Sequence, residues 1–211
     1  MHLAIAKLLE DEIPIKDKNR FSVGHILPDA VINADKKDVG SHFIENFDQN
    51  TKKHFDFYAF YERYKSKLLS DELYLGYYFH LIEDDLFRRF LYYELDLLSK
   101  RGDPIMLEEL YRDYHILNGI IVKEYALENT LCVPKGFEIE IINDIYPFDL
   151  QEFIDIIRSD FEENISGIPK RITKKRTDRF IQNCVCACKA EYTALKSGKH
   201  HLNRYDCYWD I

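Results

Sequence analysis

The segment from Leu73 to Leu91 constrains the fold of this chain most strongly, because its apolar residues recur at the spacing of one helix face. His80 and Asp84 interrupt that face, and residues four apart leave a helix on the same side. A buried imidazole and a buried carboxylate both need a polar partner, and a metal ion suits both. The segment therefore predicts a long core helix that carries a candidate pair of metal ligands.

Helical spacing continues through most of the chain. We expect helices over residues 2–11, 53–69, 71–98, 105–127, 150–164 and 177–197, an irregular stretch over 21–47, and a short extended segment over 137–142. The extended segment is too isolated to imply a sheet. A chain of 211 residues with 46% hydrophobic content is large enough for a full core. The sequence therefore predicts an all-α fold, a bundle of five to six helices in which residues 1–211 form a single domain.

Charge and hydropathy exclude two classes of protein. The net charge of −8 argues against polyanion binding, because nucleic-acid readers usually carry a basic surface, so no stable nucleic-acid complex is expected. No apolar run approaches the ~18 residues that would span a bilayer, and the start of the chain lacks a signal-peptide pattern. The five cysteines are odd in number and suggest no paired disulfide framework. These features predict a cytoplasmic protein that does not cross a membrane.

Three further polar residues join His80 and Asp84 as candidate ligands. His25 and Asp29 lie four apart in a segment that holds glycine and proline, and His42 follows thirteen residues after Asp29. Imidazole nitrogen and carboxylate oxygen are both ligands for borderline divalent cations. This set of three imidazoles and two carboxylates is therefore suited to bind one or two Zn²⁺ or similar ions.

The order of these residues resembles that of the bacterial zinc-dependent phospholipase C family, which is related to the single-strand-specific zinc nucleases. The phrases that carry the resemblance are Leu27-Pro28-Asp29, Ser41-His42-Phe43 and Leu75-Gly76-Tyr77-Tyr78-Phe79-His80. They lie in roughly the first half of the chain. The resemblance implies an all-helical fold and a metal cluster that cleaves phosphate esters.

The resemblance also implies roles for single residues. Asp29, His42, His80 and Asp84 are expected to form one metal position, with Asp84 bridging toward a second ion. The implied reaction is hydrolysis of a phosphate ester by a water bound to Zn²⁺, with Asp29 as both ligand and general base. The expected substrate is a small phosphate ester or a lipid headgroup.

Two histidines outside this core set are further candidate ligands. His25 is a candidate for the second ion, although its closeness to Asp29 also fits a role in orienting that carboxylate. His115 is a candidate on the helix over 105–127, but Gly119 stands where the family pattern has a carboxylate. That departure favours an alternative, a metal-stabilised helical binding or scaffold protein without catalysis. A third hypothesis is a metal-free helical protein whose core histidines are satisfied by hydrogen bonds.

Other aspartate, cysteine and histidine residues are expected to lie outside the metal site. Asp85 is expected to point away from the site, toward solvent or the neighbouring arginines. Cys184 and Cys188 share a helix face and are expected to be buried as small apolar residues. The histidines expected at the surface are His54, His200 and His201.

Overall fold

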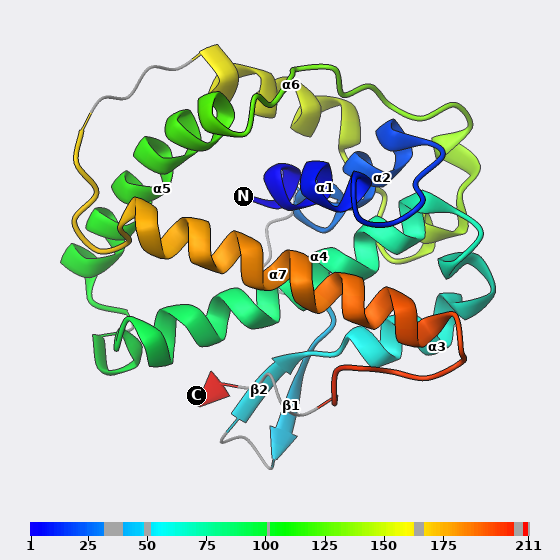
Figure 1. Cartoon of the computed structure of the whole chain (residues 1–211), viewed down its shortest axis with the longest axis horizontal. Helices are drawn as coiled ribbons and strands as arrows, with labels where there is room; N and C mark the ends of the chain where they lie inside the picture. Colours follow the sequence, from blue (N-terminus) through cyan, green and yellow to red (C-terminus); the bar gives the residue numbers. More distant parts are fainter. Residues whose placement is uncertain (32–39, 49–51, 101, 163–166, 205–208, 211) are drawn as a thin grey trace.

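The computed structural model describes the chain except residues 32–39, 49–51, 101, 163–166, 205–208 and 211. Within the described residues the chain forms seven α-helices and one small sheet (Figure 1). The helices are α1 (His2–Glu10), α2 (Lys18–Gly24), α3 (Phe57–Leu68), α4 (Glu72–Arg89), α5 (Pro104–Glu124), α6 (Leu150–Glu162) and α7 (Lys174–Leu195). The prediction of an all-α fold is confirmed. No helix in the described ranges has the length and apolar character needed to cross a membrane.

The sheet and helix α2 were not predicted from the sequence, since no expected helix covers Lys18–Gly24 and residues from 21 on were expected to be irregular. The antiparallel strands of the sheet pair in the order β1 (Ile44–Asp48), β2 (Lys52–Phe55) and β3 (Trp209–Asp210). The expected helix over 53–69 is therefore wrong at its start, because β2 occupies that start and α3 begins only at Phe57. In Figure 1 the hairpin of β1 and β2 projects from the helical body near the chain end.

Two other segments also differ from the expectation. The helix expected over 71–98 is regular only to Arg89, where a π-helical turn takes over. The extended segment expected over 137–142 is wrong, because Phe137–Ile139 and Ile141–Asp144 form 3₁₀ turns. An extended segment needs a neighbouring strand to satisfy its backbone groups, and the local turns satisfy some of them instead.

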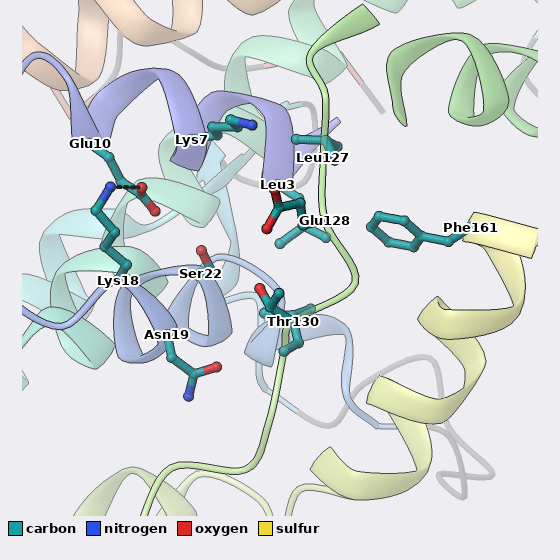
Figure 2. Close-up of a pocket in the computed structure, with 11 residues that line it drawn as sticks. Leu3, Lys7, Glu10, Lys18, Asn19, Ser22, Leu127, Glu128, Thr130 and Phe161 are labelled. Atoms are coloured by element: carbon teal, nitrogen blue, oxygen red, sulfur yellow. Dashed lines mark ion pairs between the residues drawn. The ribbon is translucent and has the colours of Figure 1, made fainter. Parts of the chain in front are cut away.

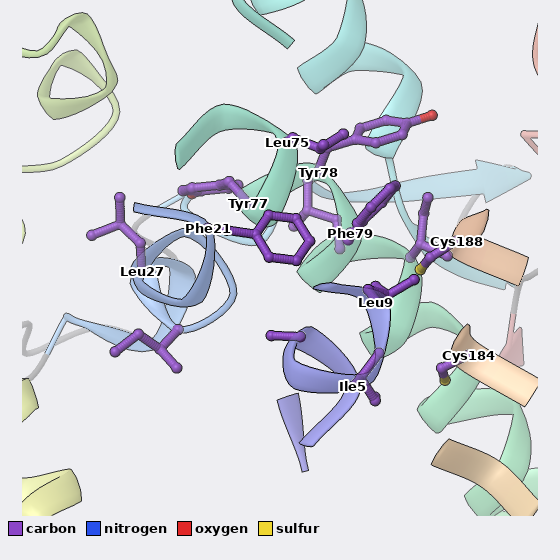
Figure 3. Close-up of a cluster of buried hydrophobic side chains, with 14 of the residues drawn as sticks. Ile5, Leu9, Phe21, Leu27, Leu75, Tyr77, Tyr78, Phe79, Cys184 and Cys188 are labelled. Atoms are coloured by element: carbon purple, nitrogen blue, oxygen red, sulfur yellow. The ribbon is translucent and has the colours of Figure 1, made fainter. Parts of the chain in front are cut away.

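Helix α4 forms the centre of the core. Its residues from Leu73 to Glu83 are all buried, and it packs against α1, α2, α3 and α7. Figure 3 shows aromatic side chains of α4 beside Phe21 of α2, Leu9 of α1 and Cys188 of α7. The helix is therefore buried on every side, and not only on the face that the sequence pattern marked.

Two glycines bring α2 and α4 into backbone contact. A Cβ added at Gly76 would lie 2.3 Å from the Phe21 carbonyl oxygen, and one added at Gly24 would lie 2.3 Å from the Leu73 carbonyl oxygen. Only glycine fits at such a close approach. The crossing places His25, the residue after Gly24, directly beside the turn of α4 that contains His80.

Several residues expected at the surface are buried. Asp85 is 1% exposed, and its Oδ1 accepts a hydrogen bond from the Phe55 backbone N–H at 3.2 Å. Burial raises the pKa of Asp85 well above its usual range. His54 is also buried, because β2 folds back onto α4. His200 is half-buried and lies 2.7 Å from the buried carboxylate of Glu191.

The cysteines behave as the sequence indicates. Cys184 and Cys188 are fully buried on α7, whereas Cys186 between them is exposed. Burial raises the pKa of the Cys188 thiol well above its usual value. The run of three cysteines is therefore part of a helix packing face and not a thiolate metal site.

Candidate metal centre

Four of the predicted ligands converge on one point. The Nε2 atoms of His42 and His80 lie 3.3 Å apart. Asp84 Oδ2 lies 3.4 Å from the first of these nitrogens and 3.3 Å from the second. Asp29 Oδ1 lies 3.1 Å from His42 Nε2 and 3.9 Å from His80 Nε2. Two imidazoles and two carboxylates thus present one atom each to a shared space.

Most of the separations between these atoms match those between the ligands of a single zinc ion. A zinc ion with bonds of about 2.0–2.2 Å to nitrogen and oxygen ligands requires its ligand atoms to be about 3.3–3.6 Å apart. The five distances above lie around that value, with only the separation of Asp29 from His80 clearly longer. The donor types also suit the metal, because imidazole nitrogen and carboxylate oxygen are both common zinc ligands. The donor types and these five separations therefore suit a Zn²⁺ ion.

Three parts of the chain supply the four donors. His80 and Asp84 share one face of α4, as their spacing predicts. Asp29 ends the 3₁₀ turn Leu27–Asp29 that follows α2, and His42 lies in the turn before β1. Exposure increases across the set, from 0% for the His80 side chain to 43% for that of Asp29. The centre is therefore closed on the α4 side and open on the Asp29 side.

A further histidine, His2, lies beside this set. Its ring stacks on that of His80, with the ring centroids 4.1 Å apart. His2 Nδ1 lies 2.6 Å from Glu83 Oε2, and His2 Nε2 lies 3.5 Å from Asp84 Oδ1, the carboxylate oxygen outside the four-atom set. His2, His80 and Asp84 thus form a second group that could hold a metal ion. His2 could not be predicted as a candidate ligand, because no local spacing connects it to residues about 80 positions later in the sequence.

His25 and His115 do not join the donors. The His25 side chain is fully buried, with Nδ1 donating to the Phe21 carbonyl at 3.0 Å and Nε2 3.2 Å from Glu83 Oε1. The prediction of His25 as a ligand is therefore corrected, because its ring turns into the core and contacts a carboxylate. His115 is exposed on α5 and belongs to none of the candidate metal groups among the described residues.

Electrostatics within the cluster favour charged carboxylates. Burial would raise the pKa of Asp84, but the neighbouring imidazoles, above all His80, lower it. The pKa of Asp29 is lowered in the same way by His80 and His42. Burial lowers the pKa of His80, but Asp84 and Asp29 outweigh burial and raise it to about 10. The carboxylates of Asp84 and Asp29 thus create a negative potential at the His80 ring. This potential stabilises a proton there and would also stabilise a divalent cation.

A cavity of about 460 Å³ opens beside the centre. His2, Asp29 and Asp84 form one side of it, and most of the remaining wall is apolar or aromatic. The aromatic wall residues are Phe87, Tyr111, Tyr114 and Phe180. A smaller cavity of about 180 Å³ shares His2 and Asp29 with it and continues between α5 and α6. The candidate ligands therefore line an opening large enough for a small molecule.

Another cavity, of about 480 Å³, lies away from these residues (Figure 2). Residues of α1, α2 and the segment 127–131 surround it, together with Phe161 of α6. Its charged side chains bind neighbouring protein groups: Lys18 pairs with Glu10 at 2.8 Å, and Lys7 donates to the Ala126 carbonyl at 2.6 Å. It contains none of the four convergent donors, so it is not the candidate catalytic site.

A further cluster of acidic and histidine side chains does not form an equivalent metal centre. Glu45, His54 and Asp56 present ligand atoms within 4.8 Å of one another. However, the Arg204 guanidinium forms an ion pair with the buried Asp56 carboxylate. A cation already neutralises this group, so a metal ion would have to displace the arginine.

Comparisons with known proteins do not extend this description. No family model, curated protein or solved structure matches the chain. The geometry of the centre is therefore the basis on which a function is assigned below.

Proposed function

We propose that this protein is a metal-dependent hydrolase of phosphate esters, with zinc as the preferred ion. The observation that carries the proposal is the convergence of carboxylate oxygens of Asp29 and Asp84 on the Nε2 atoms of His42 and His80. The resemblance of these residues to the zinc-dependent phospholipase C family supports the same assignment. The cavity beside them supplies space for a substrate.

The proposed centre has two ion positions, one with four protein donors and one with fewer. The four convergent donors would hold the first ion. His2 and Asp84 would hold a second ion, since His2 Nε2 lies 3.5 Å from Asp84 Oδ1, the oxygen outside the four-atom set. Because so few protein donors surround the second position, coordination sites there would be left to water and substrate. Catalytic zinc sites differ from structural ones in keeping such an open position.

Asp29 is the proposed general base. When bound, Zn²⁺ lowers the pKa of a coordinated water to ~7 and offsets negative charge on the phosphoryl group. Only Oδ1 of Asp29 belongs to the donor set, which leaves Oδ2 to accept a proton from the attacking water. The Asp29 side chain is 43% exposed and lines the cavity, so water and substrate can reach it.

The cavity wall favours a small phosphate ester with an apolar or aromatic substituent, or a lipid headgroup. The Phe87 ring contacts the rings of both Tyr114 and Phe180 beside the ligand cluster. Such a wall can exclude water from a phosphodiester while the cations offset its negative charge. The net charge of the chain, −8, disfavours a long polyanion as substrate. We place the reaction in the cytoplasm, on the basis of the cysteine content.

The test combines metal content with hydrolysis. Protein purified without chelator or nickel resin is analysed by inductively coupled plasma mass spectrometry and assayed with bis(p-nitrophenyl) phosphate and a short-chain phosphatidylcholine. We expect about two zinc ions per chain, and loss of both zinc and hydrolysis in Asp84→Asn. Asp29→Asn should keep most of the zinc but lose about 100-fold in rate, as expected for loss of a general base. His115→Gln is the matched control and should match the wild type. Unchanged zinc content and rate in Asp84→Asn would disprove the assignment.

A structural ion is the second candidate function. It is favoured by one observation, that the four protein donors are as many as a closed structural zinc site has. In that case one ion would join the turn at Asp29, the turn at His42 and helix α4. The protein would then bind a single zinc ion, lose thermal stability on chelation and hydrolyse neither substrate.

A further inference from the structure

We infer that His25 positions both imidazoles that face the proposed ions, His80 through its backbone carbonyl and His2 through the buried carboxylate of Glu83. The inference depends on the proposed function in one respect, that His2 and His80 are the ligands being positioned. It assigns roles to His25 and Glu83 that differ from metal ligation, since both side chains lie behind the centre. Each of these contacts is 3.2 Å or shorter, and His25, His80 and Glu83 are fully buried.

The first arm holds His80. Its Nδ1 lies 2.8 Å from the His25 carbonyl oxygen. A carbonyl oxygen can only accept a hydrogen bond, so Nδ1 of His80 carries the proton. Nε2 is then the nitrogen directed at His42 and Asp84. Ligating histidines commonly donate their other N–H to a backbone carbonyl in this way, which fixes the orientation of the ring.

The second arm holds His2. Its Nδ1 lies 2.6 Å from Glu83 Oε2, and an ionised carboxylate can only accept. Nδ1 of His2 therefore carries a proton, and Nε2 is directed at Asp84 Oδ1. Glu83 is fully buried, and its other oxygen lies 3.2 Å from His25 Nε2. These two buried atoms face each other at ion-pair distance, and neither forms a hydrogen bond within the described residues.

His25 is itself held firmly. Its Nδ1 donates to the Phe21 carbonyl at 3.0 Å, and its ring packs edge-on against the Phe21 ring with centroids 4.4 Å apart. The close approach at Gly24 and Gly76 fixes its backbone beside α4. One rigid residue thus sets the position of the His80 ring directly and that of the His2 ring through Glu83.

The two arms predict different effects of substitution. Replacing Glu83 by leucine removes the acceptor for His2 but leaves the His25 carbonyl and therefore His80 in place. Loss of such a supporting contact typically weakens metal binding about 10- to 100-fold. We expect this loss of affinity only for the second ion, which His2 would bind. Glu83→Gln keeps a side-chain oxygen that accepts from His2 Nδ1, so it should restore most of the affinity.

The test is the protonation of His2 Nδ1 in metal-free, ¹⁵N-labelled protein, read from long-range ¹H–¹⁵N spectra. We expect a protonated Nδ1 in the wild type and in Glu83→Gln. In Glu83→Leu the proton should move to Nε2, because Asp84 is then the carboxylate that faces the ring. His115→Gln serves as the control for assignment and folding. An unprotonated His2 Nδ1 in the wild type would overturn the inference without any variant.

Zinc titrations of His25 variants test the contact between His25 and Glu83. His25→Leu should weaken the second ion about 10-fold or more, and His25→Gln should restore part of it, because an amide N–H can still donate to Glu83. Equal affinity in His25→Leu and wild type would refute the role of the His25 side chain. If His2 Nδ1 is protonated as expected but no zinc binds, the proposed function fails and the positioning stands. If zinc binds and the esters are hydrolysed while Glu83→Leu behaves as wild type, only the positioning fails.

Discussion

Gly76→Ala should separate the helices that hold the metal centre together. The added Cβ would lie 2.3 Å from the Phe21 carbonyl oxygen and 2.9 Å from Gly24 Cα, both of them backbone atoms. Ordinary contacts of a Cβ begin at 3.4 Å, so α2 and α4 would have to move apart by about 1 Å. Side-chain rotation cannot relieve the overlap, since no side chain is involved.

The magnitude follows from two opposing effects. Overpacking typically costs about 1–3 kcal/mol, and the backbone contact on both sides places this site at the upper end. Alanine is favoured over glycine inside a helix by about 1 kcal/mol, which offsets part of that cost. We therefore expect a net loss of about 2 kcal/mol in the free energy of unfolding. For a chain of this size that loss corresponds to a melting temperature about 4–8 °C lower.

The same displacement should weaken zinc binding. The hydrogen bond from His80 Nδ1 to the His25 carbonyl, now 2.8 Å, would stretch beyond hydrogen-bond length. We expect zinc affinity to fall about 10-fold or more. Thermal unfolding with and without zinc measures both effects, and Gly119→Ala in α5, outside this crossing, is the control for a glycine-to-alanine change. Wild-type stability and zinc affinity in Gly76→Ala would refute the account of the helix crossing.

Three further predictions concern protonation, thiol access and a buried carboxylate. The pKa of His80 is raised from 6.5 to about 10. Protonation of His80 therefore stabilises the metal-free fold fully below pH 6.5, and this stabilisation is lost as the pH rises through about 10. Zinc must displace that proton, so its affinity should rise about tenfold per pH unit above neutrality in a chelator competition, and a flat profile would contradict this. Iodoacetamide should modify Cys186 in the folded protein but reach Cys184 and Cys188 only after unfolding, as peptide mass mapping would show. Asp113→Ala should lower the free energy of unfolding by about 3–5 kcal/mol in urea titrations while zinc affinity is unchanged, because the buried carboxylate accepts three backbone N–H groups.

The sequence identified the parts of the centre that depend on local spacing. His80 and Asp84 lie on one face of a helix because they are four residues apart, and that relation holds in any helix. Asp29 and His42 were identified by the resemblance of their phrases to a known family. The structure brings the four together, although they come from three separate parts of the chain.

The residues behind the centre could not be found in this way. Glu83 precedes Asp84 in the chain, so it resembles an ordinary charged residue of a helix surface, yet it is fully buried. His25 has the same spacing to Asp29 as His80 has to Asp84, but α2 ends at Gly24, just before His25, and the His25 ring turns inward. His2 is brought to the site only by the packing of α1 on α4. These contacts are set by tertiary packing, which a spacing rule does not encode.

The misassigned segments have the same origin. Phe137 and Ile142 are buried, whereas Ile139 and Ile141 between them are exposed. The β-favouring composition of this run therefore reflects two anchor points in the core rather than one face of a strand. Glu140 between the turns bonds to Arg20 and Tyr74, which holds the segment against α2 and α4 without any strand pairing.

The positions of the two imidazole nitrogens at the centre restrict what can lie between them. His42 Nε2 and His80 Nε2 are 3.3 Å apart, so two N–H groups pointing at each other would repel, and so would two lone pairs. One proton or one cation is required in the shared space. Two carboxylates, Asp29 and Asp84, face the same space and favour the higher charge. Since both histidines hold their other nitrogen against a protein oxygen, rotation of the rings is restrained. A divalent ion satisfies all four groups at once, whereas a single proton leaves at least one carboxylate facing an uncharged ring.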